Sequence, residues 1–430
     1  MRDFESYYAA GATWARHADP YGTAIWKAER AIPSVDPRRY EVLPFVGPPV
    51  MLPIVRAFAA LPFGAAALLW RITLLTSAAA LALCALSMAR RRLEVFSVVA
   101  VAACIAGFGP ATSAIALGQI ALPAFAATII AAVAFRRSMT IGIAASAAAW
   151  IQPNVALPLV AWFERRAAAA VAAGFALFVL ACVAVAGPAG GLRYLHVLQL
   201  HAAAERFSAI QLTPAAIAYG FGASEGAAVA IGFSIAFAAI VLWLALVPKM
   251  MDPVARFCAS CALLPFVLPF FHEHDLIVAF APAVVFAIAA TGRSRSLAIV
   301  GAILCAIDWL GLAQRPAGAL QSAVLCAAFI VALFSFRGSD WRRGSIAASA
   351  AFAALIAATL IARRDPTPVW PDAMRRLPPS VSTAPIAQVW HAETAATGLF
   401  ERNELWAALR CVPLVGCLLL TAAAVRYRRS

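Results

Sequence analysis

The chain has 430 residues, of which 63% are hydrophobic and only 13% are charged, and its formal net charge is +14 at pH 7. A soluble globular protein of this length carries about a quarter charged residues, so the composition excludes an ordinary soluble fold. Apolar runs of about 17–25 residues, long enough to cross ~30 Å of hydrocarbon, recur from position 64 to the end. We therefore expect an all-α, polytopic helical membrane protein.

The positive charge could indicate a nucleic-acid partner, but its distribution argues against one. The short turns between apolar runs hold 17 Lys and Arg against four acidic residues, whereas the remaining segments are nearly balanced. This asymmetry is typical of the positive-inside rule, which places basic loops on the cytoplasmic side. We expect membrane lipids as neighbours, no nucleic acid, and a location in the cell (inner) membrane.

With the basic turns inside, the chain divides into four parts. We expect an outer N-terminal loop with amphipathic helices over 1–62, a transmembrane helical core over 63–362, a second outer loop over 363–407, and a C-terminal transmembrane helix with a cytoplasmic tail over 408–430. Within the core, the polar stretch 188–225 should also face outward. Because residues 1–62 must be translocated with no span ahead of them, we expect the true start to lie upstream, with one further helix.

One apolar run, 139–163, should not cross the membrane in a single helix. Arginines flank it at both ends, so both ends belong on the cytoplasmic side. Gln152-Pro153-Asn154 lies at its centre, and proline removes a helical donor and clashes with the preceding turn. We predict two short helices in a hairpin whose tip reaches toward the outer side. Irregular backbone at that depth is tolerated only beside protein or a water-filled cavity.

The groups able to do chemistry gather on the predicted outer side. Residues 3–21 contain the only polar, aromatic-rich segment ahead of the apolar runs, with Asp3, Tyr7, Tyr8, Asp19 and Tyr21. No Gly-rich phosphate loop is present, and the cytoplasmic turns are too short for a nucleotide-binding domain. All histidines lie on the outer side or at its boundary: His17, His196, His201, His272, His274 and His391.

Several motifs follow one another in a recognisable order. They are DFESYYAAG (3–11) with HADPY (17–21), FVGPP (45–49), Gly118-Gln119, Gln152-Pro153 and LPFFHEHDL (268–276). In this order they resemble glycosyltransferase family 87, the DUF2029 membrane proteins, whose corresponding patterns are F-x-Y-P-P, G-Q-x-N, Lys-Pro and S-P-Y-x-H-D-Y-D-L. Gly47 stands where the family usually has Tyr, and Gln152 where it usually has Lys. The resemblance covers about residues 3–276 and implies a GT-C-like fold whose outer-face loops form the site.

The resemblance also implies an activity. It is inverting transfer of a hexose, mannose-like, from a polyprenyl-phosphate-linked donor to a lipid or glycan acceptor on the outer or periplasmic face, with no cofactor and no metal indicated. Asp3 matches the family's catalytic-base position, and a placed base contributes typically ~10²–10⁴-fold. The candidates for donor or acceptor contact are Tyr7, Tyr8, Asp19, Tyr21, Arg71, Gln119, Gln152, Arg206, His272, His274 and Asp275.

These residues also fit structural roles, and two other functions stay open. Asp3 could pair with Arg2 or cap a helix, the tyrosines could seat a helix at the membrane interface, and Arg71 could extend its charge to the interface. The H-x-H spacing at 272–274 would also suit a metal ion or a solvated turn. The nine cysteines all lie in apolar runs and should pack as small hydrophobes. A secondary transporter, and a non-catalytic membrane component of envelope assembly, are the alternative functions.

Overall fold

The computed structural model describes residues 1–33, 43–91, 94–135, 137–162, 164–250, 252–307, 319–336, 386–396 and 398–427, together with scattered positions between 342 and 357. In this part of the chain the regular structure is helical, apart from one isolated β-bridge between Gln211 and His272. The all-α prediction is therefore confirmed.

Among the described helices, four are long and apolar enough to cross a membrane, and a bent pair gives up to one more. The four are α4 (Phe63–Met88), α10 (Arg165–Glu205), α12 (Glu225–Leu246) and α20 (Glu404–Arg426). The pair, α5 (Val95–Gly107) and α6 (Gly109–Leu117), bends by 68°. On α12 the side chains of Phe233 and Phe237 are about 70% exposed, as expected of a helix that faces lipid. These features agree with the predicted polytopic membrane protein.

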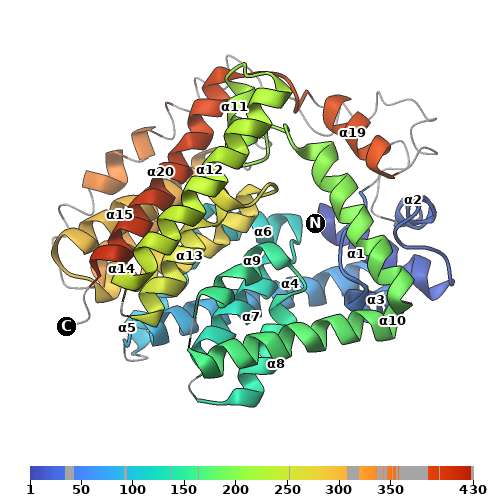
Figure 1. Cartoon of the computed structure of the whole chain (residues 1–430), viewed down its shortest axis with the longest axis horizontal. Helices are drawn as coiled ribbons and strands as arrows, with labels where there is room; N and C mark the ends of the chain where they lie inside the picture. The colour runs from blue at the N-terminus through green and yellow to red at the C-terminus, as the bar shows by residue number, and fades with distance from the viewer. Residues whose placement is uncertain are drawn as a thin grey trace.

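The helices form two groups that meet at a buried 3-10 helix, η4 (Glu273–Ala279) (Figure 1). The first group packs α4, α10, α7 (Ala121–Ala134) and α8 (Met139–Ala149) together. The second packs α12, α20, α13 (Pro253–Val267), α14 (Phe280–Ala289) and α15 (Gly292–Cys305), while α17 (Ala319–Ser335) lies against α5. Because η4 contacts α6, α7, α13 and α14, it is held on several sides.

The N-terminal segment forms a small helical layer beside α4 and the second half of α10. Its elements are α1 (Arg2–Ala15), α2 (Ala24–Arg30), the 3-10 helix η1 (Pro49–Met51) and α3 (Leu52–Ala59). In Figure 1 this layer lies on the right, with the N-terminus near α6. The start of α1 therefore lies in the interior of the fold.

Side-chain caps explain where several helices begin. The hydroxyl of Ser138 accepts the backbone N–H of Ile141 at the start of α8, and the carboxylate of Asp252 accepts that of Val254 at the start of α13. Such bonds satisfy donors that the first helical turn leaves unpaired. Proline follows the cap at α13, where the absent N–H costs nothing.

Two segments test the predicted breaks. The run 139–163 does break at its centre: α8 ends at Ala149, α9 (Pro153–Ala156) restarts after Gln152, and the 3-10 helix η2 (Leu157–Trp162) follows. The stretch 188–225 is more helical than its polarity suggested, because α10 continues to Glu205 through a kink at Gly187, whose φ is 69°. The helix α11 (Pro214–Gly220) adds a further 7 residues of the remainder.

Candidate functional site

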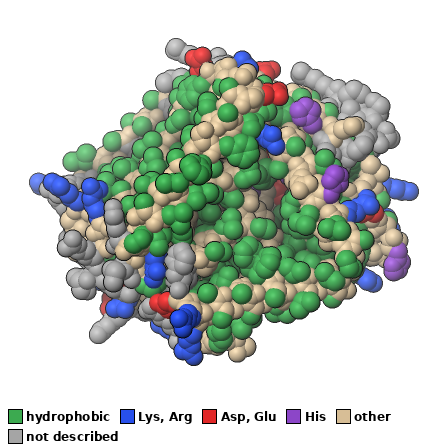
Figure 2. Space-filling model, viewed as in Figure 1, with side chains coloured by type: hydrophobic (Ala, Val, Ile, Leu, Met, Phe, Trp, Pro, Cys, Tyr) green, Lys and Arg blue, Asp and Glu red, His purple; other side chains and the backbone are tan. Residues whose placement is uncertain are grey.

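A cavity of about 150 Å³ lies between the N-terminal layer and the centre of the fold. Its wall is built by α1, the turn after α6, the residue before α9, the end of α10, the turn leading into η4, and α19 (Ile386–Ala396). These segments come from nearly the whole length of the chain. Figure 2 shows one face of the molecule, where hydrophobic side chains dominate and Lys and Arg lie mostly toward the edges.

Asp3 lies in the cavity wall. The Gln119 side chain donates to its carboxylate oxygen Oδ2. Burial raises the pKa of Asp3 to about 6, although Arg2, His272 and the bond from Gln119 all act in the opposite direction. A carboxylate with this pKa is largely ionised at neutral pH and readily takes up a proton.

Aromatic packing fixes the position of α1. The Phe4 ring is fully buried and stacks on Trp70 of α4 with centroids 5.4 Å apart. Trp70 in turn donates its ring N–H to the carbonyl of Gly118 at 2.9 Å. Gly118 has φ 85°, and a Cβ there would lie 3.1 Å from the Cβ of Phe4. Glycine therefore allows the chain to turn closely beneath α1 and bring Gln119 to Asp3.

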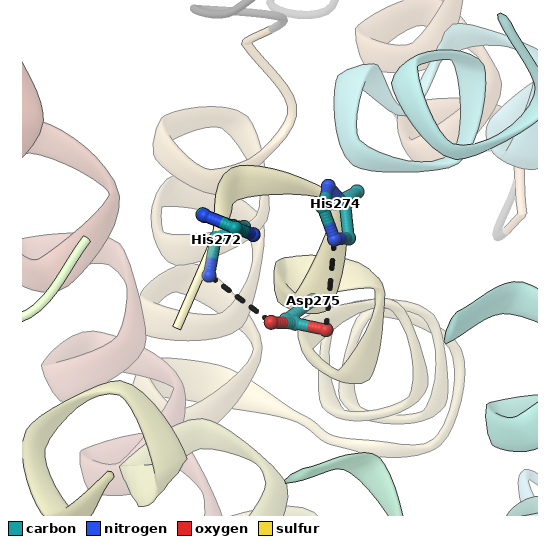
Figure 3. A group of neighbouring side chains, drawn as sticks. All are labelled: His272, His274 and Asp275. Atoms are coloured by element: carbon teal, nitrogen blue, oxygen red, sulfur yellow. Dashed lines mark hydrogen bonds and ion pairs between the residues drawn. The ribbon is translucent and has the colours of Figure 1, made fainter. Parts of the chain in front are cut away.

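The turn 272–275 forms the opposite wall (Figure 3). The Asp275 carboxylate is fully buried and accepts the backbone N–H of His272 at 3.0 Å and the Gln152 amide at 3.4 Å. His274 Nε2 lies 4.0 Å from Asp275 Oδ1, the same oxygen that accepts the Gln152 amide. The imidazoles of His272 and His274 face each other with centroids 5.0 Å apart. Gln152, at the break predicted from its neighbouring proline, thus joins the hairpin tip to this turn.

The two imidazoles differ in charge state. Burial alone would lower the pKa of His272, but Glu205, Asp275 and Asp3 together raise it above its usual value. For His274, burial and the nearby His272 hold the pKa well below the usual range. The wall therefore presents one imidazole that favours the charged form and one that is neutral at pH 7.

Glu205 is a functional candidate that the sequence interpretation missed. Its side chain is 1% exposed and accepts His272 Nε2 at 2.8 Å, Gln211 Nε2 at 3.0 Å, and the ring N–H of Trp390. His201 Nε2 lies 3.9 Å from the other carboxylate oxygen. A sequence signal was available, since His201 and Glu205 are spaced by four residues and share one helix face. The contacts to His272 and Trp390 are long-range and carry no motif, and Gln211 lies six positions further along the chain.

The structure separates the predicted site residues into two sets. Asp3, Tyr7, Gln119, Gln152, His272 and His274 line the cavity, and Asp275 lies directly behind it. Five others lie outside its wall: Tyr8, Asp19, Tyr21, Arg71 and Arg206.

Local contacts account for these five. Tyr8 donates its hydroxyl to the Leu61 carbonyl at 2.9 Å, and Tyr21 donates to the Gly47 carbonyl at 2.9 Å. Asp19 pairs with Arg193 on the second half of α10. Arg71 and Arg206 are exposed. Their polar groups position the N-terminal layer or face outward, which leaves their contact with substrate a prediction.

Comparison with known proteins gives one match. The family model described as glycosyltransferase family 87 matches residues 45–270, slightly more than half of the chain. No curated protein and no solved structure matches. The matched range includes Gln119, Gln152 and Glu205 of the cavity wall, and it lies between Asp3 and His272.

Proposed function

Because the chain belongs to glycosyltransferase family 87, we propose that it transfers a hexose from a polyprenyl-phosphate donor to a lipid or glycan acceptor, by an inverting GT-C mechanism, on the outer face of the cytoplasmic membrane. Family membership gives the reaction class, glycosyl transfer. The donor, the stereochemistry and the side of the membrane are the further content of the proposal, and the site supports them as follows.

The observation that carries the proposal is Asp3, a cavity-lining carboxylate with a pKa of about 6. In inverting transfer, the acceptor oxygen attacks the anomeric carbon while its proton passes to a carboxylate base. The bond from the anomeric carbon to the phosphate oxygen breaks, and the phosphate leaves with the electron pair. Asp3 takes the proton in this scheme, and the raised pKa brings its proton affinity close to neutral pH.

The leaving phosphate needs positive charge close to where its own charge develops. Arg2 and His272 both line the cavity and both lower the pKa of Asp3 through their charge. Fixed donors of this kind stabilise a developing anion strongly where water is scarce. The fork of N–H groups on an arginine also suits a phosphate. We assign the donor phosphate to the space between Arg2 and the 272–275 turn.

A lipid-borne donor and an outer-face site agree with the surroundings. Apolar helices such as α10 and α12 expose large hydrophobic side chains, so a polyprenyl chain can lie in the bilayer while its phosphate enters the cavity. The basic turns on the other side support the assignment of the cavity to the outer face. The bent pair α5–α6 and the broken run 139–163 are features that transporters also have, whereas family membership favours transfer.

The test compares two aspartates of the N-terminal segment. The full chain in lipid nanodiscs is supplied with a radiolabelled sugar on polyprenyl phosphate and with membrane lipid or glycan acceptors. The wild type should form a labelled product of inverted anomeric configuration. Asp3→Asn should lower kcat by about 10²–10⁴-fold, whereas Asp19→Asn, whose acid pairs with Arg193 outside the cavity wall, should keep most of the activity.

Two results would refute the proposal. Unchanged transfer by folded Asp3→Asn protein would remove Asp3 as the base. Uptake of substrate into proteoliposomes without any covalent product would instead support the transporter.

A further inference from the structure

Three side chains of the 272–275 turn are arranged like the ligands of one ion. His272, His274 and Asp275 each offer a ligand atom, and these atoms lie within 4.8 Å of one another (Figure 3). Ligand atoms bound at about 2.0–2.2 Å to one ion lie about 3–4 Å apart. The 4.0 Å between His274 Nε2 and Asp275 Oδ1 is at the upper end of this spacing, and the largest separation in the set is within 4.8 Å.

His274 provides an independent indication of a ligand. Its side chain is 6% exposed, it lies in the cavity wall, and its Nδ1 has no hydrogen-bond partner among the described residues. A buried polar atom without a partner is costly, so such atoms in native structures call for a physical explanation. A bound group in the cavity beside the imidazole would provide one.

The surroundings of His272 suit a metal-bound imidazole. Its Nε2 is 2.8 Å from Glu205 Oε2, and histidines that bind metals almost always donate their other ring N–H to such an acceptor. This leaves Nδ1 for the ion, and because only a neutral imidazole binds a metal, the ion would take the place of the positive charge that His272 otherwise carries. The competing role is structural, because the His272 side chain also accepts the backbone N–H of Asp275 and so caps η4. The experiment must separate these two roles.

The local charge also favours a cation. Asp275 is fully buried, and two neutral amides reach it: Gln152, the residue before α9, and Asn154 in α9. The imidazole of His274, 4.0 Å from the same carboxylate, is a side chain that can bind a metal.

We propose that His272, His274 and Asp275 bind one divalent transition-metal ion, such as Mn²⁺ or Zn²⁺, which supplies positive charge beside the buried Asp275 carboxylate. Two imidazoles and a carboxylate are typical ligands for these ions. Three protein ligands leave coordination positions for water or a phosphate oxygen. The ion's action on the donor phosphate as a Lewis acid rests on the proposed function, whereas the binding of the ion does not.

Metal binding is measured first, without any assay of transfer. The full chain, purified without a polyhistidine tag and stripped with a chelator, is equilibrated with Mn²⁺, Zn²⁺ or the spectroscopic probe Co²⁺. We expect close to one ion per wild-type chain. Affinity should fall at least about 10-fold in His274→Tyr and about 10–100-fold in Glu205→Gln. His196→Ala, which removes an exposed histidine, is the matched control and should bind as the wild type does.

These binding results decide whether the turn binds a metal ion or whether His272 only caps η4. Thermal unfolding of each variant confirms that it is folded, and added metal should raise the Tm of the wild type but not of His274→Tyr. Absence of a stoichiometric ion from folded wild-type protein would overturn the proposal. Equal affinity in the wild type and His274→Tyr would overturn it as well.

A variant in which a lysine replaces the bound ion then tests the role of the ion in glycosyl transfer. Chelation should lower wild-type transfer at least about 10-fold, and His274→Tyr should show a similar loss. The double variant Gln152→Lys/His274→Tyr should recover much of the transfer, bind no ion, and be insensitive to chelation. Bound metal with transfer that chelation does not change would overturn the role at the phosphate. Bound metal with no transfer in any variant would instead count against the proposed function and leave the metal site standing.

Discussion

The two walls of the cavity are built differently. On the α1 wall, Asp3 receives a side-chain bond from Gln119, and burial raises its pKa to about 6. On the opposite wall, Glu205 accepts three side-chain donors and lies beside a second imidazole, His201. One wall thus holds a weakly stabilised carboxylate, and the other holds a carboxylate whose charge is fully compensated.

This difference matches two chemical tasks. A group that must accept and release a proton works best when its two protonation states are close in free energy. A group that must keep other side chains in place works best when its hydrogen bonds are saturated and buried. The α1 wall therefore suits proton transfer, and the Glu205 wall suits the positioning of His272 and Trp390. The predictions below test this division of labour.

The largest effect should come from pH acting on the α1 wall. Since Asp3 must be ionised to act as a base and its pKa is about 6, kcat/KM should fall about 10-fold per pH unit below that value. The pH dependence of kcat/KM for the protein in nanodiscs measures this fall. Gln119→Leu removes a bond that lowers the pKa of Asp3, so its profile should shift to higher pH. A wild-type profile that stays flat down to pH 4.5 would contradict the role of Asp3.

A smaller effect, on stability, should come from the Glu205 wall. Glu205→Gln replaces a buried carboxylate by an amide that satisfies its donors poorly. We expect a loss of about 1.5–3 kcal/mol per affected charged hydrogen bond in the free energy of unfolding. Denaturant titration of metal-free protein measures this loss, so that metal binding does not contribute.

Asp3→Asn is the control for that measurement, because its expected change in the free energy of unfolding has the opposite sign. The folded-state pKa of Asp3 is raised from 3.8 to about 6, so ionisation of this group disfavours the folded state at pH values above that range. Asp3→Asn should therefore keep or raise the stability at pH 8. A large loss in Asp3→Asn, or none in Glu205→Gln, would remove the contrast between the walls.

Much of the helical framework could be predicted from the sequence, because apolar runs and caps are local signals. The run 64–89 became α4 (Phe63–Met88), and the break before Pro153 fell where proline predicted it. The predicted end at Gly187 of α10 is a break in the helix, because the backbone of this residue is not helical, but a second helical half follows it to Glu205. The end of this second half contacts Trp390 and His391 of α19, and this tertiary contact is not visible in a local pattern.

The site was only partly predictable for a related reason. Asp3 and the 272–275 turn stand in motifs, so sequence order was enough to select them. Glu205 and Trp390 are 185 positions apart and meet only through the fold. The structure at position 47 is local: a Cβ on Gly47 would lie 2.7 Å from the Phe45 ring, so a larger residue there requires the Phe45 ring to move.

The smallest effect should come from a residue that belongs to neither wall. Tyr21 is buried and does not line the cavity, but it donates its hydroxyl at 2.9 Å to the carbonyl of Gly47, which does. Because this bond reaches a backbone carbonyl and none of the groups assigned to the reaction, Tyr21→Phe should cost about 1 kcal/mol of stability and change kcat little. Tyr8→Phe, which loses an exposed bond of the same length to Leu61, is the matched control and should cost less. A strong loss of kcat in Tyr21→Phe at unchanged stability would show that the functional site extends beyond the two walls, into the loop that the sequence motif first indicated.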